Sequence, residues 1–143
     1  MRIPPFVLLI SYAGLVPALA GPIWRLVSPD SMPPWADGLW ASYIQLLAAF
    51  LAGTFWGFAL PAMEGVAGMA GMVIAAVLML LTLAATRLAF EPSLQVLAGV
   101  FLLLLAAEFW RERFLGTIEG YFRLRAVLTL TTVAAIALRL FLD

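Results

Sequence analysis

The sequence contains no cysteine, no histidine and no lysine. Without cysteine the chain cannot form disulfides, thiolate metal sites or iron–sulfur clusters, and it has no cysteine nucleophile. Without histidine it lacks the commonest general base and a usual axial ligand of haem. We therefore expect no metal, no cofactor held by protein ligands and no catalytic residue, and we predict that the protein is not an enzyme.

Charge is also scarce. Only 11% of the 143 residues are charged, whereas 65% are hydrophobic, and an average soluble protein has about 25% charged residues. So few charges cannot cover the surface of a soluble domain of this size, and lipid must therefore surround most of it. The formal net charge is zero, which gives the protein no field that attracts nucleic acid. We expect membrane lipids, some of them bound, and other integral membrane proteins as partners.

Five hydrophobic runs are long enough, or nearly so, to cross a bilayer, which takes about 20 residues in a helix. We therefore predict an all-α fold, a single membrane domain built as a bundle of about five transmembrane helices. The first run contains Pro17 and Pro22, and we expect a bend near them because proline removes a backbone hydrogen bond. This run also resembles a signal peptide, with small residues before Gly21, but we take it as a retained helix. The predicted spans are residues 3–27, 39–60, 66–86, 94–110 and 124–142.

Polar residues near the ends of these runs predict the loops and the orientation. Prolines and aspartates mark segment 27–38 as the clearest loop, and Asp37 suits the N-cap of the second span. With five spans, the side that holds the N-terminus carries five arginines and the opposite side three. Arginine favours the cytoplasmic side, so we predict a bacterial inner-membrane protein with a cytoplasmic N-terminus. The five are Arg2, Arg111, Arg113, Arg123 and Arg125, and the three are Arg25, Arg87 and Arg139.

Small residues recur at four-residue spacing in the second and third spans. Gly53 and Gly57 enclose Trp56 in a GxxxG step, and Ala67 and Gly71 begin a similar stripe. Such faces let two helix backbones approach closely in lipid. The favoured interpretation is that these two spans pack against each other within the chain. The alternative is a docking face for a partner protein.

Three polar residues in or beside the spans are candidates for function. Gln45 lies inside the second span, and we expect it to bond to another helix, for instance to a threonine of segment 129–132. Glu64 precedes the third span, where the helix dipole accounts for a carboxylate; the alternative is binding of a proton or cation. Glu108 lies near the end of the fourth span, and an interfacial pair with Arg111 is favoured over a transport role.

The arginines around the last loop lie beside aromatic residues, an arrangement typical of the membrane–water interface. We expect contacts with lipid headgroups from Arg111, Arg113, Arg123 and Arg125. Arg139 lies near the end of the fifth span, from where its long side chain can reach the interface.

Three short motifs follow one another along nearly the whole chain: SYAGLVP at residues 11–17, AGTFWGFALP at 52–61 and YFRLR at 121–125. Together they resemble an uncharacterised family of small multi-pass proteins that includes transmembrane protein 69 of mitochondria and many bacterial relatives. The chain departs from that family at Phe55, where relatives often carry histidine or arginine. The resemblance implies a five-helix inner-membrane protein and brings no established activity.

Two classes of function fit these observations. The first is an accessory subunit, or an assembly or stabilising factor, of a larger membrane complex such as a respiratory or photosynthetic one. The second is a carrier or channel for small solutes or ions that acts as an oligomer, and convergence of Gln45, Glu64 and Glu108 on one cavity would favour it. An enzyme that acts on lipid through Glu108 and Glu112 is least favoured, because no base, nucleophile or metal cluster accompanies them.

Overall fold

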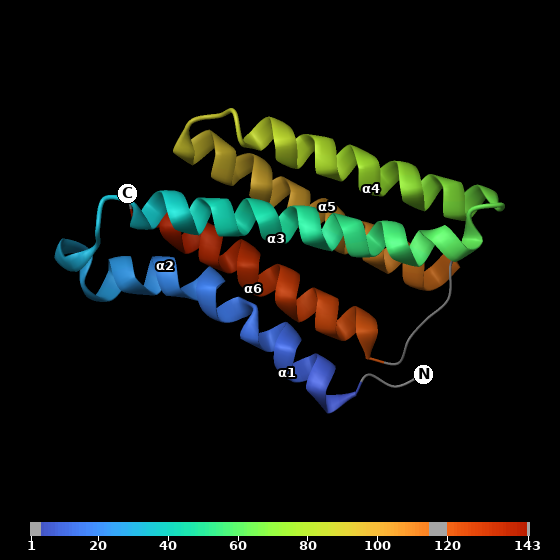
Figure 1. The fold of residues 1–143 in the computed structure, drawn as a ribbon, viewed down its shortest axis with the longest axis horizontal. Coiled ribbons are helices and arrows are strands. Elements are labelled where there is room, and N and C mark those ends of the chain that lie inside the picture. Colours follow the sequence, from blue (N-terminus) through green and yellow to red (C-terminus); the bar gives the residue numbers. More distant parts are fainter. Residues whose placement is uncertain (1–3, 115–119, 143) are drawn as a thin grey trace.

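The computed structural model describes residues 4–114 and 120–142. Within these two ranges all regular secondary structure is helical and there is no strand (Figure 1). This confirms the predicted all-α fold; the expected start of the first span at Ile3 lies outside the described residues. The elements are α1 (Pro5–Ala13), α2 (Leu15–Val27), η1 (Pro29–Ser31), α3 (Ala36–Ala59), η2 (Leu60–Ala62), α4 (Val66–Ala85), α5 (Phe90–Phe114) and α6 (Tyr121–Phe141).

Five helical stretches are long and apolar enough to cross a membrane, with α1 and α2 together forming the first, Pro5–Val27. The protein is therefore a multi-pass membrane protein. The helix α5 has 25 residues and extends four residues beyond the predicted 94–110 at each end. Pro92 does not stop it, because a proline in the first turn sacrifices no intrahelical hydrogen bond. At the other end the helix continues past residue 110 through Arg111, whose guanidinium group is buried and paired with Glu108 one turn earlier.

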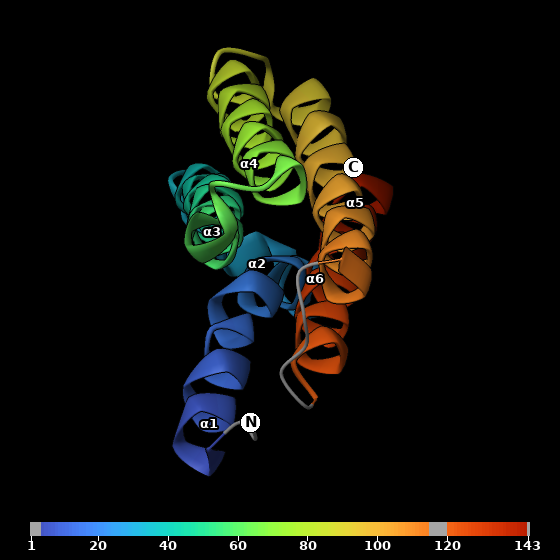
Figure 2. The same cartoon turned by 90° about the vertical axis from the view of Figure 1, so that its right-hand side faces the viewer.

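The helices form a bundle in which each packs against the next from α2 to α6, and α2 closes it against α6. The helices α3 and α5 also touch through the centre. Figure 2 shows α1 leaving this bundle at an angle. It contacts α2 and α6, and none of its residues is buried. The N-terminal part of the first span is thus the least packed helix of the described chain.

The core lies mainly between α3, α5 and α6, where Ile44, Phe101 and Ile136 are completely buried. A second, smaller cluster centres on Phe55 and lies against α4 and α5. The side chains of both clusters are buried between the helices. Since lipid is as apolar as the core, close van der Waals contact supplies much of the attraction between the helices.

The first span is broken at Gly14, three residues before Pro17, and not at the prolines themselves. Pro17 has no N–H for the carbonyl of Ala13, and its ring crowds the preceding turn, so the interruption falls on the N-terminal side of the proline. The bend therefore lies about one turn before its predicted place. The hydroxyl of Tyr43 on α3 donates a hydrogen bond to the Gly14 carbonyl at this break.

At the second proline, α2 passes through Pro22 without a break. The missing N–H of Pro22 leaves the carbonyl of Ala18 without its helical partner, and the indole N–H of Trp40 donates to that carbonyl at 2.8 Å. The indole lies so close that a Cβ on Gly21 would be 2.6 Å from it. A side chain of α3 thus compensates for the proline of α2, and glycine makes the approach possible.

The contact between α3 and α4 does not run through the GxxxG step. Gly53 and Gly57 are exposed, and within the described chain an added Cβ at either position would meet nothing within 4 Å. The buried residues of α3 here lie on the opposite side of the helix, namely Ala52, Phe55 and Ala59. The two spans pack against each other within the chain as expected, but the interpretation of Gly53 and Gly57 as the face of that contact was wrong. On α4, Gly68, Gly71 and Ala75 are buried and Ala67 is half-buried.

Candidate functional site: a buried charge cluster beside a lateral groove

Glu108 lies near the C-terminal end of α5, and only 1% of it is exposed. Its Oε2 is 2.9 Å from Nε of Arg111, one turn further along the same helix, and its Oε1 is 2.7 Å from Nη2 of Arg125 on α6. Arg111 and Arg125 are also buried, at 2% and 4% exposure. We call these three residues the charge cluster.

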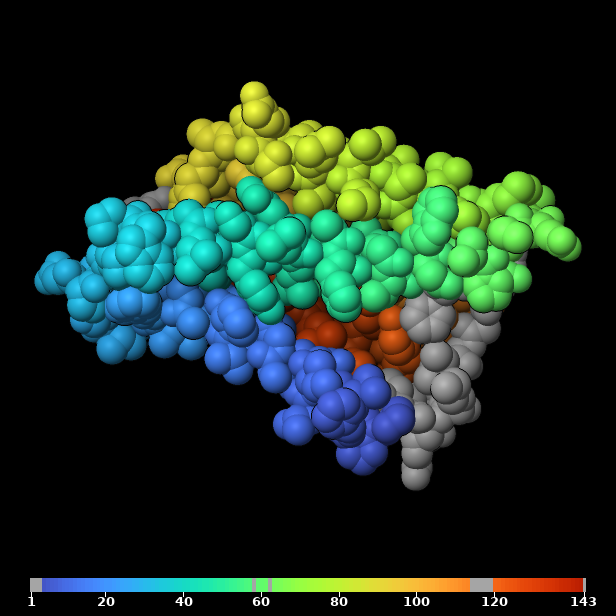
Figure 3. Space-filling model, in the orientation of Figure 1, coloured from blue at the N-terminus to red at the C-terminus, as the bar shows by residue number. Residues whose placement is uncertain are grey.

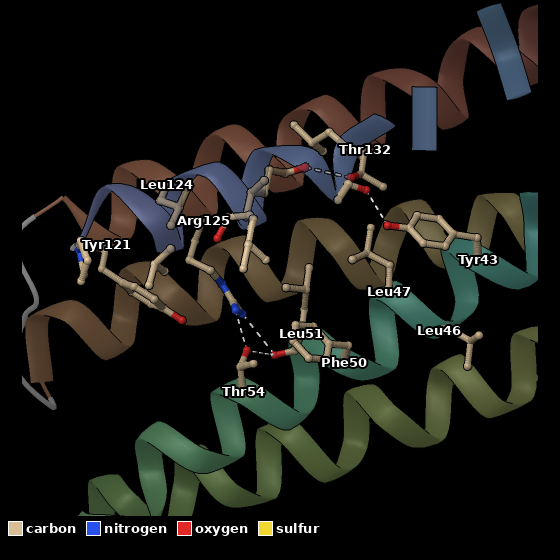
Figure 4. Close-up of a pocket in the computed structure, with 17 residues that line it drawn as sticks. Tyr43, Leu46, Leu47, Phe50, Leu51, Thr54, Tyr121, Leu124, Arg125 and Thr132 are labelled. Carbon is tan, nitrogen blue, oxygen red and sulfur yellow. Dashed lines mark hydrogen bonds between the residues drawn. The ribbon is translucent and has the colours of Figure 1, made fainter. Parts of the chain in front are cut away.

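Arg125 continues the cluster to α3, as Figure 4 shows. Its Nη1 donates to the hydroxyl of Thr54, and its Nη2 donates to the Leu51 carbonyl at 3.1 Å. The ring of Tyr121 lies near both guanidinium groups, 5.1 Å from that of Arg111 and 5.7 Å from that of Arg125. These distances allow cation–π attraction. The cluster therefore ties the membrane-embedded parts of α3, α5 and α6 together.

The cluster contains two guanidinium groups and one carboxylate that pairs with both. Charge inside a membrane is unfavourable unless it is paired and hydrogen-bonded. Glu108, Thr54 and the Leu51 carbonyl satisfy part of this need, but Nε of Arg125 is buried without a hydrogen-bond partner in the described part of the chain. Arg125 thus retains an unused hydrogen-bond donor inside the bundle.

A groove of about 700 Å³ lies beside the cluster, between α1, α3 and α6. In Figure 3, α6 is visible at the bottom of the hollow between α1 and α3. The groove therefore opens sideways from the bundle, toward the surrounding lipid. Thr54, Tyr121 and Arg125 form its polar end. Most of the remaining wall is apolar and includes Val7, Ile10, Leu46, Leu47, Phe50 and Leu128.

The family model described as "Protein of unknown function (DUF3429)" matches residues 3–141, nearly the whole chain. The chain belongs to the DUF3429 family. No curated protein and no solved structure matches it. The resemblance to the family of transmembrane protein 69 stays a prediction.

In this DUF3429 protein the expected pair of Glu108 and Arg111 is present, but its surroundings differ from the prediction. The pair is buried inside the bundle and shares Arg125 as a third member. The sequence could not indicate that third member, because Arg125 lies on another helix and only the packing of α5 against α6 brings it close.

The four arginines expected at lipid headgroups divide into two groups. Arg111 and Arg125 are buried in the charge cluster, so the headgroup interpretation is wrong for them. Arg113 and Arg123 are exposed, and for them it stays a prediction. The helix α6 begins at Tyr121, and residues two apart on a helix face different sides, so Arg123 faces outward while Arg125 faces the bundle.

A second group of charged residues links α2, α3 and α6 at the other end of the bundle. Nε and Nη2 of Arg139 on α6 donate to the two carboxylate oxygens of Asp37 on α3 at 3.1 and 2.8 Å. Arg25 on α2 is 3.6 Å from the same carboxylate, and Phe90 lies 4.8 Å from the Arg139 guanidinium. The expectation that Arg139 reaches the interface was wrong, because it is buried at 3% exposure.

Asp37 is not the N-cap of the second span. The helix α3 begins at Ala36, its cap residue is Trp35, and no side chain caps it. Asp37 therefore lies in the first turn, where the helix dipole still favours a carboxylate. Its position inside the helix directs it to arginines on α2 and α6.

The polar candidates do not meet at one site. Gln45 is half-buried on α3, and the structure records no hydrogen bond from it to Thr129, Thr131 or Thr132, all within the described ranges. Glu64 is exposed in the turn before α4. Neither of them, nor Glu108, lines the lateral groove. Among residues 4–114 and 120–142, no three acidic side chains gather as metal ligands.

Proposed function

We propose that this DUF3429 protein is a non-catalytic accessory or stabilising subunit of a larger membrane complex, in the bacterial inner membrane. The observation that carries this proposal is the engagement of its buried charges. Every charged side chain that is buried in the described helices belongs to an ion pair between or within helices, namely Glu108, Arg111, Arg125 and Arg139. Charges used in this way stabilise a scaffold.

Catalysis or proton transfer would place different demands on these residues. A general acid or base needs a group that gains and loses a proton within reach of a substrate. Glu108 is instead held in ion pairs with two guanidinium groups and does not line the groove. The separation of Gln45 and Glu64 from the groove also speaks against a transport path. The arrangement supports a role in binding rather than in chemistry.

The exposed face of α3 with Gly53 and Gly57 is an argument for a partner protein. A glycine inside a helix weakens it by about 0.5–1 kcal/mol relative to alanine, and no close helix contact within the described chain makes use of Gly53 or Gly57. A transmembrane helix of another protein would fit closely against this step. Trp56, which is 41% exposed beside it, adds a large apolar surface for such a helix.

Native gel electrophoresis of mildly solubilised membranes tests the accessory role at natural expression level. We expect the chain to migrate with a much larger complex, and the Gly53→Leu/Gly57→Leu variant to lose this association while it still folds. Ala76→Leu is the matched control, because Ala76 is an exposed small residue on α4. Migration of the unmodified protein as a lone monomer would contradict the proposal.

The proposal includes the predicted orientation, with the N-terminus in the cytoplasm. The exposed or half-buried arginines of the described residues divide equally, with Arg113 and Arg123 on the N-terminal side and Arg25 and Arg87 on the opposite side. The proposed orientation therefore rests on the count of all eight arginines, five against three. A reporter fused after Asp143 that is active only outside the cytoplasm should be active. Activity of a cytoplasm-specific reporter at the same position would reverse the orientation.

A carrier for small solutes, acting as an oligomer, is the second candidate. The lateral groove that reaches Arg125 is the observation in its favour. Its weakness is that the groove opens sideways and has mostly apolar walls, whereas a polar solute needs a hydrated path. Solute flux into liposomes that contain the purified protein, above that of empty liposomes, would favour it over the accessory role.

A further inference from the structure

The lateral groove is charged at one end only, where the guanidinium group of Arg125 lies beside Thr54 and Tyr121. At the other end the hydroxyl groups of Tyr43 and Thr132 donate to backbone carbonyls. Most of the remaining lining is aliphatic or aromatic. The groove volume of about 700 Å³ lies within the range of about 300–1,000 Å³ that is typical of small-molecule sites. A ligand that matches it has a polar head and an apolar body.

The charge at the polar end selects the sign of the head. Arg125 lines this end of the groove, and its Nε has no hydrogen-bond partner among the described residues. A guanidinium group has five N–H donors, and oxygens of a carboxylate or phosphate are its preferred acceptors. An anionic head would accept hydrogen bonds from the Arg125 guanidinium group.

The depth of the groove agrees with an amphiphile that lies along the membrane normal. Arg125 is four residues after the first residue of α6, which is about 6 Å along the helix. Figure 1 shows that the start of α6 and the start of α1 lie at the same end of the bundle. The polar end of the groove thus lies toward the end of the bundle at which α1 and α6 begin, and the apolar wall extends from it along the helices.

We propose that the lateral groove binds an anionic amphiphile, a molecule with a long hydrocarbon chain and a carboxylate or phosphate head. The head meets Arg125 and Thr54, and the chain lies between α1, α3 and α6. The sideways opening lets such a molecule enter from the bilayer without crossing water. This site is independent of the proposed partner face, because Gly53 and Gly57 do not line the groove.

Photolabelling of the full-length protein in a neutral maltoside detergent tests this proposal. The probes are a 16-carbon fatty acid with a photoreactive diazirine in its chain, the fatty alcohol of the same chain, and a phosphatidic acid that carries that chain. We expect at least tenfold stronger labelling by the acid or the phospholipid than by the alcohol, at peptides of α1, α3 and α6. The stronger of the two anionic probes shows whether a free fatty acid or a phospholipid headgroup is preferred.

A pair of variants on α6 separates the groove from the general lipid surface. Leu128→Trp fills the groove, and Leu130→Trp, at a position 51% exposed on the outer face, is the matched control. We expect Leu128→Trp to lower the labelling by the anionic probes about tenfold and Leu130→Trp to leave it unchanged. Equal labelling of the unmodified protein by acid and alcohol, or labels spread over the outer faces of all helices, would overturn the proposal without need of any variant.

Discussion

At the scale of single residues, Glu108 has the most demanding position in the protein. It is almost completely buried and pairs with both Arg111 and Arg125. The Tyr121 ring lies near both arginines, but it is neutral and cannot replace a carboxylate. Loss of Glu108 would therefore remove one ion-pair partner from each of two buried arginines.

We predict that Glu108→Ala destabilises the protein by about 3–5 kcal/mol, because removal of one partner leaves buried charges uncompensated. The measurement is the free energy of unfolding in detergent, or the thermal midpoint where unfolding is irreversible. Glu112→Ala is the control on the same helix, since Glu112 is half-exposed, and it should change stability by less than about 0.5 kcal/mol. Equal effects of the two substitutions would mean that the cluster does not stabilise the fold.

At the scale of elements, the junction between α2 and α3 shows how a membrane helix tolerates proline. The carbonyl that Pro22 leaves unbonded would be unfavourable in hydrocarbon, and the indole of Trp40 bonds to it. That contact requires a close approach of the two helices, which Gly21 allows because it has no Cβ. Gly21 and Pro22 of α2 and Trp40 of α3 therefore form one structural unit at this junction.

We predict that Gly21→Ala destabilises the protein by about 1–3 kcal/mol, because the new methyl group would overlap the Trp40 indole and displace it from the Ala18 carbonyl. Unfolding in detergent measures the effect, and the tryptophan emission should shift as the indole moves. Gly53→Ala is the matched control, because its Cβ would meet no neighbour within the described chain. It should leave the purified protein as stable or more stable. If Gly21→Ala left the free energy of unfolding unchanged, the close approach of Trp40 to Gly21 would not matter for stability.

At the scale of the whole molecule, packing is uneven. The helices α2 to α6 form a closed bundle, whereas α1 has no buried residue and leans outward. The lateral groove exists because of this departure, since α1 forms one of its walls. The hinge at Gly14 therefore separates a stable body from a weakly held helix that borders the groove.

We predict that the two parts respond differently to the same substitution. Ile44→Ala, at a completely buried position of α3, should destabilise by about 2 kcal/mol or more through lost packing. Ile10→Ala on α1, at a position 55% exposed, should cost less than about 0.5 kcal/mol. Hydrogen exchange should also be faster in α1 than in α5, as local stability follows packing. Equal protection of the two helices would show that α1 is held as firmly as the core.

The sequence by itself determined the membrane class and the number of spans, because composition and the length of hydrophobic runs reflect a solvent that is the same along the whole chain. It also predicted the local pair of Glu108 and Arg111, since residues three apart on one helix are neighbours in any fold. Tertiary structure alone decided which side each helix turns inward. That choice exposed Gly53 and Gly57, buried Arg125 and Arg139 beside carboxylates on other helices, and opened the groove beside α1. Periodicity could not reveal these outcomes, because in lipid the inward and outward faces of a helix are almost equally apolar.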